Sequence, residues 1–289
     1  MGEEKERIAL KLGYLGTRYH GFQIQPQAIG PTIEGELFDA LQKLGIMRDR
    51  ASSNYAAAGR TDKGVHALGQ VVSFDTAYPN LTPRMINSLL PDDIWIIAIA
   101  KPPQGFHARR DAISRAYRYF LAVHPALELD ITRMREAAEL FIGAHDFSNF
   151  AQPSDQDRKE DVPGCHTTIR EVKRLEVVSD KTRSFIIIDI EADGFLRKMV
   201  RKIVSALKLV GSGTKAKSWV EDLLELRITD QIEPVPAFGL LLKAVVYHGL
   251  EFVEDGYAKR RIAARIQENL RFHATMAEVL GTMVTDYAP

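Results

Sequence analysis

The sequence lacks most of the features that mark exported, zinc-binding or membrane-spanning chains. Its 289 residues include one cysteine, Cys165, which excludes an intrachain disulfide and a zinc site built from several cysteines. The longest clearly apolar run, residues 94–100, is far shorter than the roughly 20 residues that span a bilayer. The first residues, MGEEKERIALKLG, have no basic segment followed by a signal-peptide apolar stretch. We therefore expect a soluble, cytoplasmic protein with no membrane partner.

An excess of charge of either sign is also missing. The 38 Lys and Arg residues balance 38 Asp and Glu residues, so the composition alone indicates no polyanionic partner. Hydrophobic residues make up 45% and charged residues 26% of the chain, which excludes disorder and coiled coil as its main state. Any surface that binds nucleic acid must therefore be local.

The order of strand and helix patterns indicates an α+β protein. Alternating apolar residues at 8–14 predict a half-buried strand, and apolar residues three and four apart after Thr32 predict a helix that ends at Gly45. We expect further strands at 54–58, 69–75, 94–100, 114–123, 168–179, 182–192 and 240–247, and helices at 82–90, 131–142, 195–210, 218–226 and 256–280. Mixed strands and helices with hairpins between strands favour antiparallel sheets over a doubly wound parallel sheet.

This pattern divides the chain into three segments. Residues 1–105 and 106–250 each predict an α+β domain, and residues 251–289 predict a helical extension. The extension either docks on the body of the protein or contacts RNA or a partner. The polar stretch 151–164, with two prolines, predicts a mobile loop.

The segment GRTDKGVH, residues 59–66, places one carboxylate between two cations and between two glycines. Asp followed by Lys-Gly is also common in turns, so a structural role is the alternative. Arg60 and Lys63 would favour the ionised form of Asp62, and an ionised carboxylate is what a covalent nucleophile requires. The segment is therefore the first candidate for a catalytic site.

A strongly basic stretch lies between residues 195 and 217. It holds seven cations and no Asp or Glu, namely Arg197, Lys198, Arg201, Lys202, Lys208, Lys215 and Lys217. On a helix, Arg197, Arg201 and Lys208 would lie roughly on one side. This predicts a basic stripe, although such a run is often only a solvated face.

A second basic stretch, residues 101–124, carries five cations against the single acidic residue Asp111. Tyr117, Tyr119 and Phe120 stand among these cations. Cations interleaved with aromatic rings can bind phosphates and stack on bases. Two such stretches favour an RNA-binding surface.

Metal and nucleotide sites are not indicated. The eight histidines show no pair at the spacing of metal ligands. The segment GSGTK, residues 211–215, lacks the spacing of a phosphate-binding loop and follows a predicted helix rather than preceding one. We expect no metal and no nucleotide cofactor.

The segment AGRTDKGVHA at 58–67, followed by GQV at 69–71 and Phe74, resembles the signature of the TruA family of tRNA pseudouridine synthases. Three further segments match in the same order: 14–25 (YLGTRYHGFQIQ), FHAR at 106–109 with RAYRY at 115–119, and 194–213. The resemblance covers roughly residues 8–248. Lys63, where bacterial relatives often carry Ala, and the acidic stretch 155–161 depart from the pattern.

The resemblance implies an isomerase that converts uridine to pseudouridine in the tRNA anticodon stem-loop, at positions 38–40, without metal or cofactor. It also implies a homodimer of two ferredoxin- or RRM-like α+β domains. Their antiparallel sheets would join into one extended sheet, with a catalytic cleft between the domains. The alternative is a non-catalytic RNA-binding or tRNA-folding protein on the same scaffold.

The resemblance also assigns roles to individual residues. Asp62 would be the nucleophile, Arg60 would contact it and help open the RNA stem, and Arg201 would pair with it. Tyr117 would pack on the target base, and Leu240 would form an apolar wall of the pocket. The expected substrate-binding residues are Leu240, Arg109, Arg115, Arg197, Lys198, Lys202 and Gln70. The intact Asp62 and its expected partners argue against the non-catalytic alternative.

Overall fold

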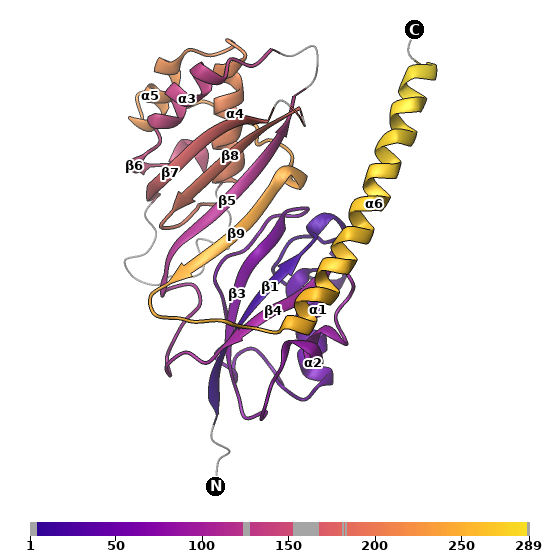
Figure 1. Ribbon diagram of the computed structural model, residues 1–289. Helices are drawn as coiled ribbons and strands as arrows, with labels where there is room; N and C mark the ends of the chain where they lie inside the picture. The colour runs from indigo at the N-terminus through magenta and orange to yellow at the C-terminus, as the bar shows by residue number, and fades with distance from the viewer. Residues whose placement is uncertain (1–4, 124–127, 153–167, 181, 183, 288–289) are drawn as a thin grey trace.

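One continuous β-sheet runs through both halves of the computed structural model, which describes residues 5–123, 128–152, 168–180, 182 and 184–287 (Figure 1). Across this ten-stranded sheet the order is β10 (Val253–Glu254), β4 (Ile94–Ala100), β1 (Glu6–Tyr14), β3 (His66–Thr76), β9 (Leu240–Tyr247), β5 (Ala112–Ala122), β8 (Phe185–Ala192), β7 (Ile169–Asp180) and β6 (Gly143–Asp146), with β2 (Ala56–Ala57) paired to β3 beside this path. The sheet positions every element of the candidate site.

The two halves of the sheet join where β3 pairs with β9. This pairing is parallel and short, with His66 opposite Leu241 and Ala67 opposite Leu242. The other pairings among the described strands are antiparallel. The predicted α+β class, with mostly antiparallel sheets joined into one, is confirmed.

The first half buries one face of the sheet under helices. These are α1 (Ile33–Lys43) and α2 (Pro83–Asn87), and two short 3-10 helices, η1 (Gly16–Arg18) and η2 (Gln27–Ile29), lie in the connection from β1 to α1. Thr32 caps α1 as predicted, because its hydroxyl accepts a hydrogen bond from the Gly35 N–H at 3.2 Å. The predicted strand at 54–58 is only two residues long. Asn54 precedes it with a φ of 45°, a left-handed conformation that ends a turn.

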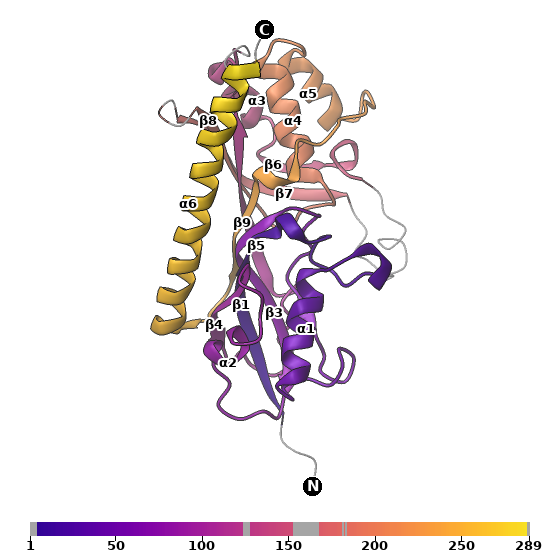
Figure 2. The same ribbon diagram turned by 90° about the vertical axis from the view of Figure 1, so that its right-hand side faces the viewer.

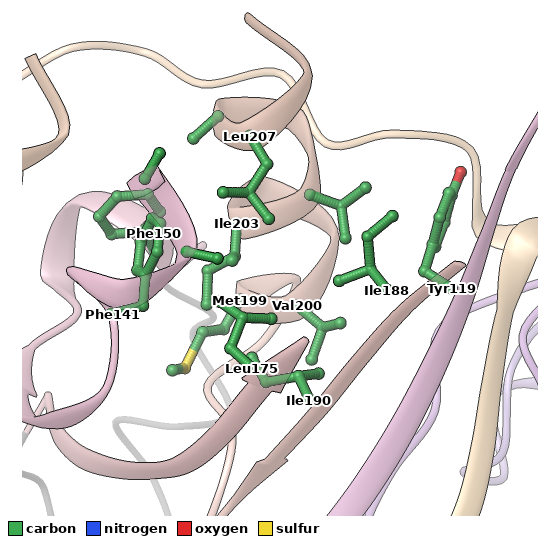
Figure 3. Close-up of a cluster of buried hydrophobic side chains, with 14 of the residues drawn as sticks. Tyr119, Phe141, Phe150, Leu175, Ile188, Ile190, Met199, Val200, Ile203 and Leu207 are labelled. Carbon is green, nitrogen blue, oxygen red and sulfur yellow. The ribbon is translucent and has the colours of Figure 1, made fainter. Parts of the chain in front are cut away.

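The second half packs its helices on the same sheet. They are α3 (Ile131–Glu139), α4 (Met199–Gly211) and α5 (Lys217–Leu224), with the 3-10 helices η3 (Ser148–Phe150) and η4 (Ala237–Gly239). Figure 3 shows side chains of α4, among them Met199, Ile203 and Leu207, gathered with Ile188 and Ile190 of β8. Burying each of these side chains contributes roughly 1.5–3 kcal/mol. This packing fixes α4 relative to the sheet.

The start of α4 differs from the predicted helix at 195–210. Lys198 has φ 61° and ψ 2°, so it interrupts the helical backbone and the helix begins at Met199. Arg197 therefore precedes the helix and does not share a helical face with Arg201 and Lys208. The prediction of one stripe through these three residues was wrong.

The C-terminal helix α6 (Gly256–Tyr287) is longer than the predicted 256–280. Its first turns dock on the body, where Ala258 and Ile262 pack against Trp95 of β4. The helix then runs along the side of the sheet opposite α1, α4 and α5 (Figure 2). None of the described helices is both long and apolar enough to cross a membrane.

Two further predictions concern the division of the chain. The boundaries at 105 and 250 stay predictions. The loop expected at 151–164 lies almost entirely outside the described residues, and Cys165 lies outside them as well.

Candidate active site

Asp62 lies in the connection from β2 to β3, and the backbone on either side of it is firmly held. The hydroxyls of Thr61 and Tyr14 lie 2.8 Å apart, and the Thr61 carbonyl accepts a hydrogen bond from the Phe22 N–H at 3.0 Å. The Asp62 carbonyl accepts one from Val65 at 3.2 Å. These bonds fix the turn, while the Asp62 side chain remains 24% exposed.

Arg201 of α4 reaches across to this loop. Its Nη1 donates to Oδ2 of Asp62 at 3.0 Å, and its Nε donates to the Val235 carbonyl at 2.7 Å. A hydrogen bond between two ionised groups is stronger and more directional than one between neutral groups. The ion pair that the resemblance implied is present, and it spans the two halves of the chain. The catalytic roles of both residues stay predictions.

Tyr117 of β5 lies beside this ion pair. Burial raises the pKa of Tyr117, the charge of Arg115 lowers it, and the negative charge of Asp62 raises it. The ring meets Phe195 edge to face, with the ring centroids 5.2 Å apart. Tyr117 therefore carries a neutral, well-held ring near Asp62, as packing against a base requires.

Leu240 follows a segment that is fixed by two hydrogen bonds. Besides the bond from Arg201 to Val235, the Tyr119 hydroxyl donates to the Pro236 carbonyl at 2.9 Å. Burial raises the pKa of Tyr119 to about 12, and the charge of Arg201 opposes this shift. Leu240 is buried at the start of β9. The sequence did not reveal this positioning role of Tyr119, although its place in the motif RAYRY could have drawn attention to it.

His66 is a second residue whose role the sequence did not reveal. Its Nδ1 accepts a hydrogen bond from the Gly16 N–H at 3.1 Å, so its Nε2 carries the proton and donates to the Phe238 carbonyl, also at 3.1 Å. Burial lowers the pKa of His66, which favours this neutral form. His66 thus ties the start of β3 to the segment before Leu240.

Arg115 and its neighbours show how a predicted substrate contact can be structural. The two Nη atoms of Arg115 donate to four carbonyls, those of Ala58, Arg109, Ala112 and Asp193, at 2.6–3.2 Å. Burial lowers the pKa of Arg115. Its guanidinium holds the backbone around the site together, and direct contact with substrate stays a prediction.

The side chains of Gln70 and Lys202 also donate hydrogen bonds to main-chain carbonyls. Gln70 is fully buried, and its Nε2 donates to the Gly59 carbonyl at 2.9 Å, so it holds the start of the loop in place. The Nζ of Lys202 donates to the carbonyls of Ala151 at 2.8 Å and Asn149 at 3.4 Å. The expected binding roles of Gln70 and Lys202 stay predictions.

The remaining cations lie at the surface around the loop. Arg60, Arg109 and Arg197 are exposed, and Lys198 is half-buried where α4 begins. The predicted contact of Arg60 with Asp62 stays a prediction. Arg197 and Lys198 directly precede α4, and Arg201 in the first turn of this helix places its positive charge beside the Asp62 carboxylate. Within the described ranges, no group of three or more His, Cys, Asp or Glu residues could hold a metal ion.

Comparison with known proteins adds independent evidence. Residues 12–109 and 137–248 match the family model described as tRNA pseudouridine synthase. The chain is 46% identical over 279 residues to tRNA pseudouridine synthase A of Methanococcoides burtonii, covering 95% of both chains. It is 44% identical over 282 residues to the protein of the same name from Methanosarcina barkeri, covering 96% of this chain and 99% of that one. Among solved structures, a Cbf5-Nop10-Gar1 complex matches 70% of this chain and 45% of that chain, at 12% identity and a TM-score of 0.35. By its match to the family model and to these full-length relatives, the chain belongs to the tRNA pseudouridine synthase family, a family of isomerases.

Proposed function

We propose that this chain isomerises uridine to pseudouridine in the tRNA anticodon stem-loop, at positions 38–40, with Asp62 as the nucleophile. The observation that carries the proposal is the Asp62–Arg201 ion pair, which lies beside Tyr117 and the segment leading to Leu240. Membership of the family supports tRNA as the substrate. The enzyme acts as a cytoplasmic homodimer and needs no metal or nucleotide cofactor.

The reaction is balanced without an oxidant or reductant. The bond between N1 of uracil and C1′ of ribose breaks, and a bond between C5 and C1′ forms. A proton leaves C5 and a proton is taken up at N1, so the product has the composition of the substrate. The Asp62 carboxylate adds to the base or the sugar during the exchange and leaves when the new bond is complete.

The side chains around Asp62 have distinct tasks in this reaction. Arg201 holds the carboxylate in one orientation, and the Tyr117 ring and Leu240 enclose the flat pyrimidine. Because the reacting atoms are inaccessible in a stacked stem, the nucleotide must be extruded at a cost of a few kcal/mol. Phosphate contacts from exposed cations such as Arg197 and Arg60 offset part of that cost.

The test is a map of pseudouridine in an unmodified tRNA transcript after incubation with the protein. We expect the parent to modify positions 38–40, and Asp62→Asn, which preserves the shape of the side chain, to bind tRNA without modifying it. Asp39→Asn, at an exposed site on α1, is the matched control and should remain active. Full activity of Asp62→Asn would exclude Asp62 as the nucleophile.

Two other outcomes would change the proposal. An inactive parent that still binds tRNA would favour the non-catalytic RNA-binding or tRNA-folding protein. Modification confined to positions outside 38–40 would retain the chemistry but overturn the assigned target.

A further inference from the structure

The outer part of α6 carries a large apolar surface. Nine large apolar side chains between residues 266 and 287 are 37–83% exposed: Ile266, Leu270, Phe272, Met276, Val279, Leu280, Met283, Val284 and Tyr287. Exposed apolar surface of this kind marks interaction sites in soluble proteins. Packing of an amphipathic face also supplies most of the stability of helices in proteins, since isolated helices are marginal in water. A helical segment about 33 Å long, at roughly 1.5 Å per residue, therefore needs a partner.

The apolar residues follow the seven-residue repeat of paired helices. Ile262 packs on Trp95 of its own chain, and steps of four and three onward from it give the seam Ile266, Asn269, His273, Met276, Leu280, Met283 and Tyr287. The other exposed apolar residues, Leu270, Phe272, Val279 and Val284, flank this seam directly. The opposite face carries Gln267, Glu268, Arg271, Ala274, Thr275, Glu278, Gly281, Thr282 and Thr285. Apolar residues at a spacing of 3.5 are the pattern by which two helices pack side by side.

Charge is distributed unequally along α6. Residues 256–265 contain four cations and no acidic residue, whereas residues 272–287 contain Glu278 and Asp286 and no Lys or Arg. Two copies lying parallel would bring the four cations of each copy together. Two copies lying antiparallel bring the basic end of each helix to the acidic end of the other and oppose the helix dipoles favourably.

We propose that α6 is the contact surface between two copies of this chain, with the two helices packed antiparallel. The repeat then sets Ile266 against Met283 of the second copy and His273 against Met276 of the second copy. Two-fold symmetry forms each of these contacts twice. The inference deepens the homodimer of the proposed function by naming its surface.

Sedimentation equilibrium of the full chain tests this surface. The variant Met276→Glu with Leu280→Glu puts charge into the seam and should weaken the dimer at least 100-fold. Thr275→Glu with Thr282→Glu adds the same charge to the opposite face of the helix and should leave the dimer unchanged. Far-ultraviolet circular dichroism checks that all three proteins keep their helix content.

The results separate the possible failures. A monomeric parent would overturn the proposed surface, and it would mean that α6 folds back on its own sheet or stays unpaired. An unchanged dimer in the seam variant would also overturn it, while leaving a homodimer through another surface. Pseudouridine formation is measured separately on each protein, so an inactive parent that dimerises through α6 would contradict only the proposed function.

Disulfide formation tests the direction of the two helices. In a Cys165→Ser background, Ile266→Cys and Met283→Cys are prepared separately and then mixed under oxidising conditions. The antiparallel arrangement predicts a cross-linked dimer in the mixture and little in either protein alone, because disulfides need Cα atoms within roughly 7 Å. Efficient cross-linking of Ile266→Cys alone would show parallel helices and overturn the antiparallel register.

Discussion

Arg201 and Asp62 stand 139 positions apart in the chain and are joined by a hydrogen bond of 3.0 Å between Nη1 and Oδ2. Arg201 comes from α4, which is packed in the core of the second half, and Asp62 comes from a loop of the first half. Because each half supplies one partner, the carboxylate is oriented only while both halves are docked. The geometry of the site and the pairing of β3 with β9 are therefore coupled.

Replacing Arg201 should reduce catalysis far more than stability. Arg201→Met removes the bonds to Asp62 and Val235, and we expect the single-turnover rate to fall about 10²-fold or more. Arg201→Lys keeps the charge but not the planar fork, so it should recover only part of the rate. Lys208→Met, on the same helix and about two turns away, is the control. Equal losses in the Arg201→Met and control variants would contradict a specific role for Arg201.

The hydroxyl groups of Tyr14 and Thr61 should make coupled contributions to the free energy of unfolding. Both side chains are buried and their oxygens lie 2.8 Å apart, so Tyr14→Phe or Thr61→Val alone takes from the remaining buried hydroxyl the partner at 2.8 Å. Each single change should lower the free energy of unfolding by about 1–3 kcal/mol. The double variant should lose less than the sum, which urea unfolding of all four proteins can measure. Strict additivity would mean that the two hydroxyls do not interact.

The sequence predicted the parts of the site that are encoded locally. Thr32 caps α1 because capping depends on a residue and the backbone three positions later, and the loop around Asp62 was marked by its own unusual composition. The start of α4 was misplaced because the apolar pattern continues back to Phe195, whereas the left-handed backbone at Lys198 leaves no trace in that pattern.

Local sequence patterns do not predict contacts between segments that are distant in the chain. The bond between His66 and the Phe238 carbonyl joins residues 172 positions apart and involves a main-chain atom that every residue type possesses. The basic and aromatic neighbours of Arg115 predict a contact with substrate, which stays a prediction. Only the fold shows that four carbonyls surround its guanidinium.

His66 should make stability depend on pH below neutrality. Burial lowers its pKa in the folded chain below the ordinary value of 6.5. Above pH 6.5 the ring is neutral in both states and its contribution is complete. As the pH falls below 6.5, the unfolded chain binds the proton more readily, so stability is lost until the pH passes the folded pKa.

The variant His66→Gln tests this dependence. Between about pH 7.5 and 5.5, the free energy of unfolding of the parent should fall more steeply than that of His66→Gln, as measured in urea. His248→Gln, at an exposed position after β9, should behave like the parent. The same slope in the parent and in His66→Gln would contradict the assigned neutral form.

Arg197 and Lys202, two cations near the start of α4, should contribute differently to the salt dependence of tRNA binding. Arg197 is exposed, so Arg197→Ala should remove a phosphate contact and reduce the slope of log K against log salt by roughly 0.7–0.9. Lys202 is bonded to the carbonyls of Ala151 and Asn149, and burial lowers its pKa, so Lys202→Ala should lower stability and leave the slope nearly unchanged. Arg260→Ala, on α6, is the control for a change of charge remote from the site. A reduced slope for Lys202→Ala with unchanged stability would reverse these assignments and make Lys202 the phosphate ligand.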